Sequence, residues 1–220
     1  MDARQVAVLH ALVIERYVSR SASVGGAPVA TLDALDLDAL RDVVAACTRC
    51  RLCEGRTQTV FGVGHRAARW FVVGEAPGAD EDRLGEPFVG RAGQLLNAML
   101  AAVGLPRESV YIANVLKCRP PGNRDPQAIE VESCIGYLRR QIELVRPDLV
   151  LCVGRIAAQN LLGTDAALAK LRGQVHRLDG VPAPVVVTYH PAYLLRTPAD
   201  KRKAWADLKF AREVASGTVA

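Results

Sequence analysis

The cysteines are the residues whose spacing most directly suggests chemistry. Cys47 and Cys50 form a CxxC, Cys53 adds a second two-residue gap, and fifteen residues separate Cys118 from Cys134. A CxxC brings two sulfurs to one side of a turn, and a second pair completes the four thiolates that bind zinc or an iron-sulfur cluster. A redox dithiol normally lies between a strand and a helix, whereas this CxxC follows a predicted helix. The spacing therefore favours a metal centre of either kind.

Not all six cysteines are needed for such a centre. CxxCxxC is similar to the start of a bacterial ferredoxin motif, but the next cysteine of that motif would fall at Thr57. Cys152 lies within the apolar run LVLCVGR, which predicts a small buried hydrophobe. Disulfides are disfavoured because the chain carries no convincing secretory signal. We therefore predict four metal ligands, with Cys53 as the spare: Cys47, Cys50, Cys118 and Cys134.

An acidic loop rich in glycine and proline is the second feature that suggests a site. It lies within residues 71–96, FVVGEAPGADEDRLGEPFVGRAGQLL, directly after an apolar run. The loop lacks both the GxGxxG of dinucleotide-binding folds and the Gly-Lys-Ser/Thr of a P-loop. The run Asp80, Glu81 and Asp82 would also repel a phosphate. We therefore do not expect a phosphate cradle here.

The elements that must position these residues follow from the hydrophobic pattern. Uniformly apolar runs alternate with helical patterns, which predicts an α/β fold whose parallel sheet is covered by helices on both faces, a three-layer α/β/α arrangement. The predicted strands are 70–73, 110–115, 148–153 and 185–189, and the predicted helices are 35–46, 92–103, 126–145 and 155–162. Ligands of such folds bind beyond the carboxyl ends of the strands. The polar segments at those ends are 74–82, 114–124, 154–155 and 190–196.

Length, composition and charge set the wider limits. The 220 residues, half of them hydrophobic, suit one α/β domain. A net charge of +5 suits a polyanionic partner, although a basic housekeeping enzyme fits equally well. Residues 6–14 are apolar but are interrupted by His10, so we expect an amphipathic helix rather than a signal peptide. Residues 21–30, SASVGGAPVA, are expected to form a linker. We expect a soluble, cytoplasmic monomer with no membrane span.

Six segments in consistent order along residues 45–210 point to one family: GEAPGADED, GEPFVGRAGQLL, NVLKCRPPGNRDP, LVLCVGR, LRGQV and TYHPAYLLR. Together they resemble the family 4 uracil-DNA glycosylases, the iron-sulfur type of bacteria and archaea. The resemblance implies a central four-stranded parallel sheet with flanking helices, and a 4Fe-4S cluster on Cys47, Cys50, Cys118 and Cys134. It also implies a glycosylase domain over 31–220, with an N-terminal helix and linker over 1–30 outside it.

The resemblance also implies roles in recognising uracil. Asn114 would read the Watson-Crick edge, because an amide both accepts from N3-H and donates to O4. Phe88 would stack on the flipped base, unless it is a core aromatic that closes the loop. His190 would donate a hydrogen bond near uracil O2 and stabilise the developing anion. The wall of the base pocket would be formed by Gly74, Glu75, Ala76, Pro77 and Gly78.

The group that activates water is less clearly indicated. Other uracil glycosylase families carry an aspartate where this sequence has Ala76. Glu81 and Asp82 are the candidates, and Glu81 is preferred because the family often has glutamate there. The alternative is that both are solvated loop charges.

DNA would be held by cations and by one loop. Arginines and lysines near the strand ends are candidates to contact the DNA backbone: Arg119, Arg124, Arg155, Arg196, Lys201, Arg202 and Lys203. The segment 191–195 resembles the minor-groove loop of the family, and Tyr193, Leu194 or Leu195 would wedge into the base stack.

The sequence thus predicts a monofunctional uracil-DNA glycosylase of base excision repair that acts on single- or double-stranded DNA and leaves an abasic site. Two alternatives stay open. A cross-linking superfamily relative would bind uracil-DNA covalently, but it carries a histidine-containing insertion that KCRPPGNRDP lacks. A non-catalytic iron-sulfur module that senses DNA is the other.

Overall fold

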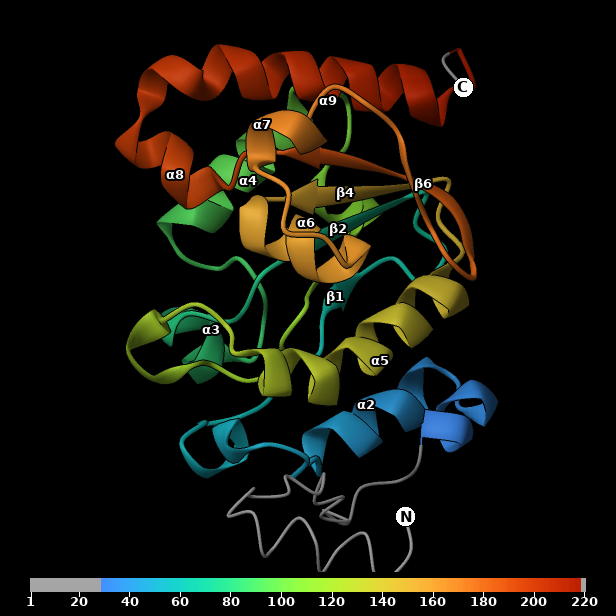
Figure 1. Ribbon diagram of the computed structural model, residues 1–220, viewed down its shortest axis with the longest axis vertical. Coiled ribbons are helices and arrows are strands. Elements are labelled where there is room, and N and C mark those ends of the chain that lie inside the picture. Colours follow the sequence, from blue (N-terminus) through green and yellow to red (C-terminus); the bar gives the residue numbers. More distant parts are fainter. Residues whose placement is uncertain (1–28, 219–220) are drawn as a thin grey trace, which may run out of the picture.

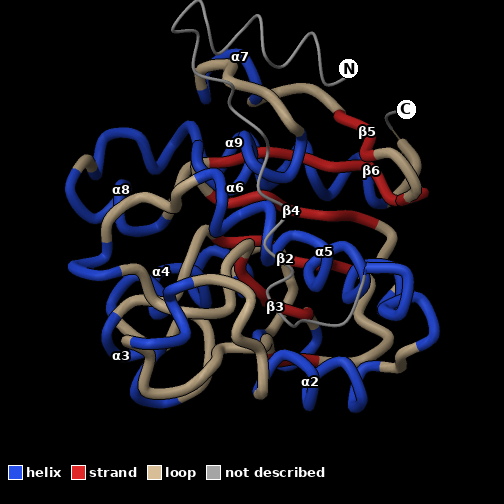
Figure 2. The backbone as a smooth tube through the Cα atoms, turned by 60° about the horizontal axis from the view of Figure 1, so that its bottom comes forward, coloured by secondary structure: helices blue, strands red, loops and turns tan. Residues whose placement is uncertain are grey.

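The computed structural model describes residues 29–218. Its centre is a six-stranded sheet in the order β1-β3-β2-β4-β6-β5, in which the four inner strands are parallel and both edge strands are antiparallel. The strands are β1 (Val63–Gly64), β2 (Trp70–Gly74), β3 (Tyr111–Asn114), β4 (Leu149–Val153), β5 (His176–Leu178) and β6 (Val181–Thr188). Figure 2 shows them as successive segments with helices on both sides.

Helices complete the three layers (Figure 1). The helices are α2 (Leu37–Ala45), α3 (Ala79–Leu84), α4 (Arg91–Ala101), α5 (Ala128–Val145), α6 (Arg155–Leu162), α7 (Leu168–Leu171), α8 (Pro191–Arg196) and α9 (Lys201–Ala215). Short 3-10 turns link them at Val29–Ala34, Arg51–Glu54, Arg107–Ser109, Pro121–Asn123 and Pro198–Asp200.

The inner strands form because apolar residues occupy both faces. Every residue of β2, β3 and β4 is buried. On one face, Phe71, Val73 and Cys152 pack against α5 and α6. On the other, Val72 and Leu151 pack with α4 and α9. Burial on both faces explains the uniformly apolar runs in the sequence.

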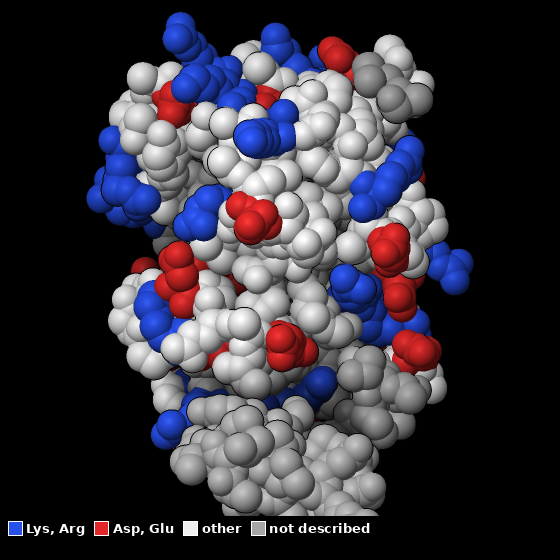
Figure 3. All heavy atoms as spheres, in the orientation of Figure 1, with Lys and Arg blue, Asp and Glu red and all other residues white. Residues whose placement is uncertain are grey.

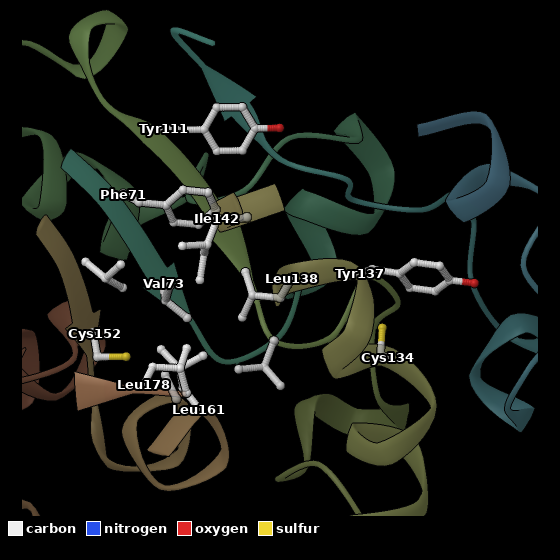
Figure 4. Close-up of a cluster of buried hydrophobic side chains, with 14 of the residues drawn as sticks. Phe71, Val73, Tyr111, Cys134, Tyr137, Leu138, Ile142, Cys152, Leu161 and Leu178 are labelled. Atoms are coloured by element: carbon white, nitrogen blue, oxygen red, sulfur yellow. The ribbon is translucent and has the colours of Figure 1, made fainter. Parts of the chain in front are cut away.

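Figure 4 shows the first of these two clusters in close-up. Cys152 lies within it and is fully buried, as the sequence predicted. Cys134 lies on α5 beside Tyr137, at the edge of the cluster. The two cysteines therefore occupy different environments, and only Cys134 borders the cysteine cavity described below.

The predicted α/β/α fold and its four parallel strands are confirmed, but the two edge strands and the last described helix were not predicted, and neither were the short helices α3, α7 and α8. The edge strands β1 and β5 are short, and the pattern gave no alternation long enough to indicate them. A signal for β5 was present, since Asp179 and Gly180 form the two-residue turn that joins it to β6. The last described helix, α9, packs Leu208, Ala211 and Val214 against the sheet.

The N-terminal segment and the absence of a membrane span were the two expectations for the chain as a whole. The predicted N-terminal helix and linker lie outside the described residues, so the domain boundary near residue 31 stays a prediction. Within residues 29–218, no helix combines the length and the apolar character needed to cross a membrane.

Candidate active site and cysteine cavity

A pocket of about 490 Å³ opens beyond the carboxyl ends of the parallel strands. In Figure 1 it lies on the side where the β4 arrowhead points and where α3, α4 and α8 gather. Four separate parts of the chain line it. They include most residues that the sequence analysis singled out: Glu75, Ala76, Pro77, Gly78, Glu81, Phe88, Asn114, His190, Tyr193 and Arg196. The fold therefore brings these separate motifs to one place.

Asn114 ends β3 and forms the floor of this pocket. Its side chain is 2 % exposed, and its Oδ1 is a buried side-chain oxygen for which residues 29–218 supply no hydrogen-bond donor. Such orphaned acceptors are rare in folded proteins and call for an explanation. Gly74 lies opposite Asn114 in the parallel register, and a Cβ at Gly74 would clash with Asn114 Oδ1 and the Phe88 ring. Gly74 thus does not line the cavity but makes room for the two residues that do.

Phe88 forms one wall of the pocket. It has a positive φ of 55°, an unusual conformation for a bulky residue, and it is 7 % exposed. Its ring lies 5.7 Å from the His190 ring, centroid to centroid. Gly93 packs so closely on the Phe88 carbonyl that a Cβ there would clash. Phe88 both borders the pocket and packs with the α4 and sheet cluster, so the stacking role and the structural role coincide in one side chain.

His190 caps the start of α8 and is held as a neutral donor. Its Nδ1 accepts a hydrogen bond from the Ala192 amide at 3.1 Å, which leaves Nε2 to carry the proton. The pKa of His190 is lowered to about 4, chiefly by burial and also by Arg196, while Glu81 opposes the shift. Gly154, at the end of β4, has a positive φ of 102° and lets the His190 side chain approach the backbone. Near pH 7 the imidazole is therefore uncharged.

Glu75 is the carboxyl group with the most perturbed ionisation in the pocket. Its pKa is raised to about 7, chiefly by burial and also by Asp125, while Arg155 opposes the shift. Asp125 and Arg155 lie 3.6 Å apart as an exposed ion pair at the mouth. Sequence motifs placed Glu75 in the pocket wall but gave no indication of its protonation near neutral pH.

Glu81 and Asp82 have different surroundings. Glu81 lines the pocket, and its carboxylate accepts backbone hydrogen bonds from Gly78, Val89 and Gly90, which closes the loop between α3 and α4. Asp82 is buried outside the pocket and accepts from the Thr57 amide at 3.0 and 3.1 Å. The idea that Asp82 activates water is therefore wrong, because its carboxylate is committed to the backbone elsewhere.

Some candidate DNA-binding side chains already bond to other residues of the protein, whereas others are exposed. Arg124 forms an ion pair with the buried Glu130 and supports its own loop, and Arg119 donates to Asn123. Exposed cations cluster on α8 and at the start of α9: Arg196, Lys201, Arg202 and Lys203. Figure 3 shows Lys and Arg gathered over these two helices at the upper left. Of this group, Lys203 pairs with Asp200.

The proposed wedge requires one correction. Leu194 is 1 % exposed and lies on the buried side of α8, so it is not available to enter the DNA in this conformation. Leu195, which the sequence analysis also considered, is 37 % exposed. Tyr193 lines the pocket, stacks on Tyr189 and donates to Asp200. Sequence alone did not separate the two leucines because both are apolar neighbours on a short helix.

Five cysteines line a second, small cavity: Cys47, Cys50, Cys53, Cys118 and Cys134. Sulfurs of the predicted ligands accept hydrogen bonds from Tyr137 Oη to Cys47, from Arg56 to Cys118 and from the Lys117 amide to Cys134, at 3.2 to 3.3 Å. Burial raises the pKa of Cys134 to about 12 and also raises that of Cys118, although Arg56 opposes the rise at Cys118.

The cavity has the donor chemistry of a cluster site. Among residues 29–218, no three His, Cys, Asp or Glu side chains converge on a position for one metal ion. Thiolate sulfurs bind zinc or iron-sulfur clusters, and N-H donors to sulfur are typical of such metal sites. Arg56 and Lys117 were not singled out from the sequence; Lys117 offered no signal, whereas Arg56 lies three residues after Cys53.

Comparison with known proteins agrees with this arrangement. The profile of the uracil DNA glycosylase superfamily matches residues 61–209, which include the whole pocket. The chain is 46 % identical to a type-4 uracil-DNA glycosylase of Archaeoglobus fulgidus over 81 % of this chain and 92 % of that protein. It is 41 % identical to one of Pyrobaculum aerophilum over 79 % of this chain and 92 % of that protein. The chain therefore belongs to the uracil DNA glycosylase superfamily and, within it, to the type-4 family.

Proposed function

We propose that this protein is a monofunctional uracil-DNA glycosylase that hydrolyses the bond between uracil and deoxyribose and leaves an abasic site. The observation that carries the proposal is the buried, unpartnered Oδ1 of Asn114 on the pocket floor, beside Phe88 and His190. An acceptor fixed there matches the N3-H of uracil. The described residues that line the pocket include no lysine, so they offer no amine for a lyase reaction.

Recognition follows from the directions of these groups. Asn114 Oδ1 accepts from N3-H while its Nδ2 donates to O4, and the Phe88 ring stacks on the base. Cytosine presents an acceptor at N3 and a donor at N4, so it would face like groups on both atoms. A site with fixed, buried polar groups rejects such a mismatch strongly.

Bond cleavage needs stabilisation of two opposite charges. As the C1′–N1 bond breaks, its electron pair leaves with uracil, and the sugar gains oxocarbenium character. The Nε2-H of neutral His190 donates to O2 and stabilises the anion. We propose that Glu81 acts on the sugar. Its carboxylate faces the positive charge, and an oxygen lone pair not used by the backbone amides orients the attacking water. The water adds its oxygen to C1′ and gives up one proton, which the departing uracil anion takes up, so that the products are neutral uracil and the abasic sugar.

We further propose that Cys47, Cys50, Cys118 and Cys134 hold a 4Fe-4S cluster, with Cys53 as the spare. Support comes from five sulfurs on one cavity and from the hydrogen bonds that three of the four ligands accept. When bound, the cluster would join the segment after α2 to the segment after β3 by covalent bonds. The reaction itself requires none of its electrons.

The partner is uracil-containing DNA, held by the cations of α8 and α9 and by Arg155 at the mouth of the pocket. Tyr193 and Leu195 are the side chains that we propose to fill the space left by the flipped base. We retain a monomer as the working expectation.

The test is release of uracil from an oligonucleotide that contains one uracil, detected as strand cleavage in hot alkali. Asn114→Ala and His190→Ala should each lower the single-turnover rate by about 100- to 1000-fold, the loss typical of a deleted donor to a developing anion. His65→Ala is a matched control, because the exposed His65 also accepts from the amide two residues on.

Asn160→Ala is the matched asparagine control, since its side chain donates within α6 and does not line the pocket. Both controls should keep the wild-type rate. An inactive wild-type protein with its cluster bound would refute the enzyme proposal, and a stable covalent product with the DNA would favour the cross-linking alternative.

A further inference from the structure

Lys117 is a buried cation within the segment NVLKCRPPGNRDP, and neither the sequence analysis nor the proposed chemistry gave it a role. Its side chain is 1 % exposed, and none of the ion pairs between described residues includes it. A buried ammonium is costly unless its protons find acceptors. Here Nζ donates to the backbone carbonyl of Asn114 at 2.9 Å and to Gln141 Oε1 at 2.6 Å.

Gln141 fixes the far end of this interaction. It is fully buried on α5, and its Nε2 donates to the Phe61 carbonyl at 2.9 Å. The amide oxygen of Gln141 is therefore aimed at Lys117 by a bond to a different part of the chain. A rigid helix thus orients the ammonium that holds the Asn114 carbonyl.

The backbone on either side of Asn114 is also held. The amides of Val115 and Leu116 donate to the carbonyls of Gly74 and Glu75 at 2.9 and 3.0 Å. Lys117 therefore lies on a segment that joins the pocket floor to the cysteine cavity, because its own amide donates to Cys134 Sγ and Cys118 follows it.

We propose that Lys117 is a positioning residue for base recognition: through the Asn114 carbonyl it fixes the direction in which the Asn114 amide faces the uracil. The expected effect on uracil release rests on the proposed function, whereas the expected effect on the backbone near Asn114 rests on the hydrogen bonds alone. Misplacement of a reacting or recognising group by about 1 Å costs roughly 100-fold in rate, so the ammonium has a large effect without touching the substrate.

Lys117→Met tests this, with Gln141→Met as a graded comparison, because Gln141 orients the ammonium but does not itself contact Asn114. Both changes place the same apolar side chain into the same buried network, but only the first removes the donor to Asn114. At a temperature where each variant is fully folded, Lys117→Met should lower the single-turnover rate of uracil release by about 10- to 100-fold. Affinity for DNA with a tetrahydrofuran abasic analogue should stay within about twofold, because phosphate contacts dominate binding.

Hydrogen exchange gives a readout that does not depend on activity. The amides of Val115 and Leu116 should exchange faster in Lys117→Met and only slightly faster in Gln141→Met, which keeps the donor to Asn114 but loses the group that orients it. Equal losses of rate in the two variants, or unchanged exchange in Lys117→Met, would overturn the proposal. An inactive wild-type protein would refute the proposed function alone, since the exchange comparison still decides the role of Lys117.

Discussion

At the scale of single residues, the pocket holds two ionisable groups whose neutral forms are both favoured between about pH 4 and pH 7. Burial lowers the pKa of His190 to about 4 and raises that of Glu75 to about 7. The same physical cause acts in opposite directions because one group is charged when protonated and the other when deprotonated. The imidazole can therefore donate to uracil O2 without adding a positive charge to the pocket.

Glu75→Gln should make stability less sensitive to pH. A carboxyl whose pKa rises from 4.5 to about 7 on folding stabilises the protein fully below pH 4.5, and this stabilisation is lost as the pH rises through 7. The variant should therefore melt a few degrees above the wild type at pH 8, with the difference shrinking as the pH falls toward 5. Paired melting curves between pH 5 and 8.5 measure this, and a constant difference would contradict it.

The sequence predicted which residues line the pocket where they belong to a recognisable motif. It did not predict the conformations of those residues. Asn114, Phe88 and His190 were placed from their segments, and all three line the pocket. The positive φ of Phe88 and the burial of Leu194 depend on tertiary packing, which local sequence does not encode. Lys117 had no distinguishing pattern because its role depends on Gln141, twenty-four residues later.

At the scale of elements, the site depends on how closely α4 begins behind Phe88. Gly93 lies in the first turn of α4 and packs directly on the Phe88 backbone, which leaves no room for a methyl group. Arg107 also donates to the carbonyls of Pro87 and Phe88 from the far side of the loop. The conformation of Phe88 is thus determined by a helix start and a cation together.

Gly93→Ala should disrupt this close packing. We expect a loss of about 1 to 3 kcal/mol in the free energy of unfolding, typical of overpacking, together with slower uracil release because Phe88 moves. Gly136→Ala is the control, since a Cβ at this helical position in α5 meets only Leu32 at an ordinary 3.5 Å. That change should be neutral or stabilising by up to about 1 kcal/mol. Denaturant unfolding measures both, and equal stabilities would refute the packing argument.

The regular elements of the core were the most predictable part of the fold. The helix 155–162 matches α6 at both ends, and the four parallel strands match within a few residues. Uniform burial makes such strands readable from composition alone. The helices α3 and α8 were read as loops because each has six residues and is formed by its position around the pocket.

At the scale of the whole molecule, the cysteine cavity connects segments that are far apart in the sequence. Cys47 and Cys50 follow α2, whereas Cys118 follows β3 and Cys134 lies on α5. Arg56 bridges the Cys47 carbonyl and the Cys118 sulfur, and the next residue, Thr57, is bound by Asp82 of α3. These hydrogen bonds therefore connect the cysteine segment to the α3 side of the pocket.

Cys118→Ser should therefore affect stability first. The proposed cluster should be lost without its fourth thiolate, which weakens the visible absorbance, and the melting temperature should fall by about 10 °C or more because metal binding contributes to folding. Cys53→Ser should retain both properties if Cys53 is the spare. Loss of the cluster in Cys53→Ser would reassign the ligand set, and unchanged melting without a cluster would refute the structural role.

The edges of the sheet have a consequence for how the molecule meets other molecules. A parallel sheet with bare edges would offer unpaired backbone groups to any extended chain. Here β1, with two residues, and β5, with three, close the two sides in antiparallel pairing. Edge strands this short offer few backbone groups with which a strand of another chain could pair. Sideways growth into fibrils or strand-exchanged pairs is disfavoured, and the loops at the strand ends stay clear for a nucleic acid.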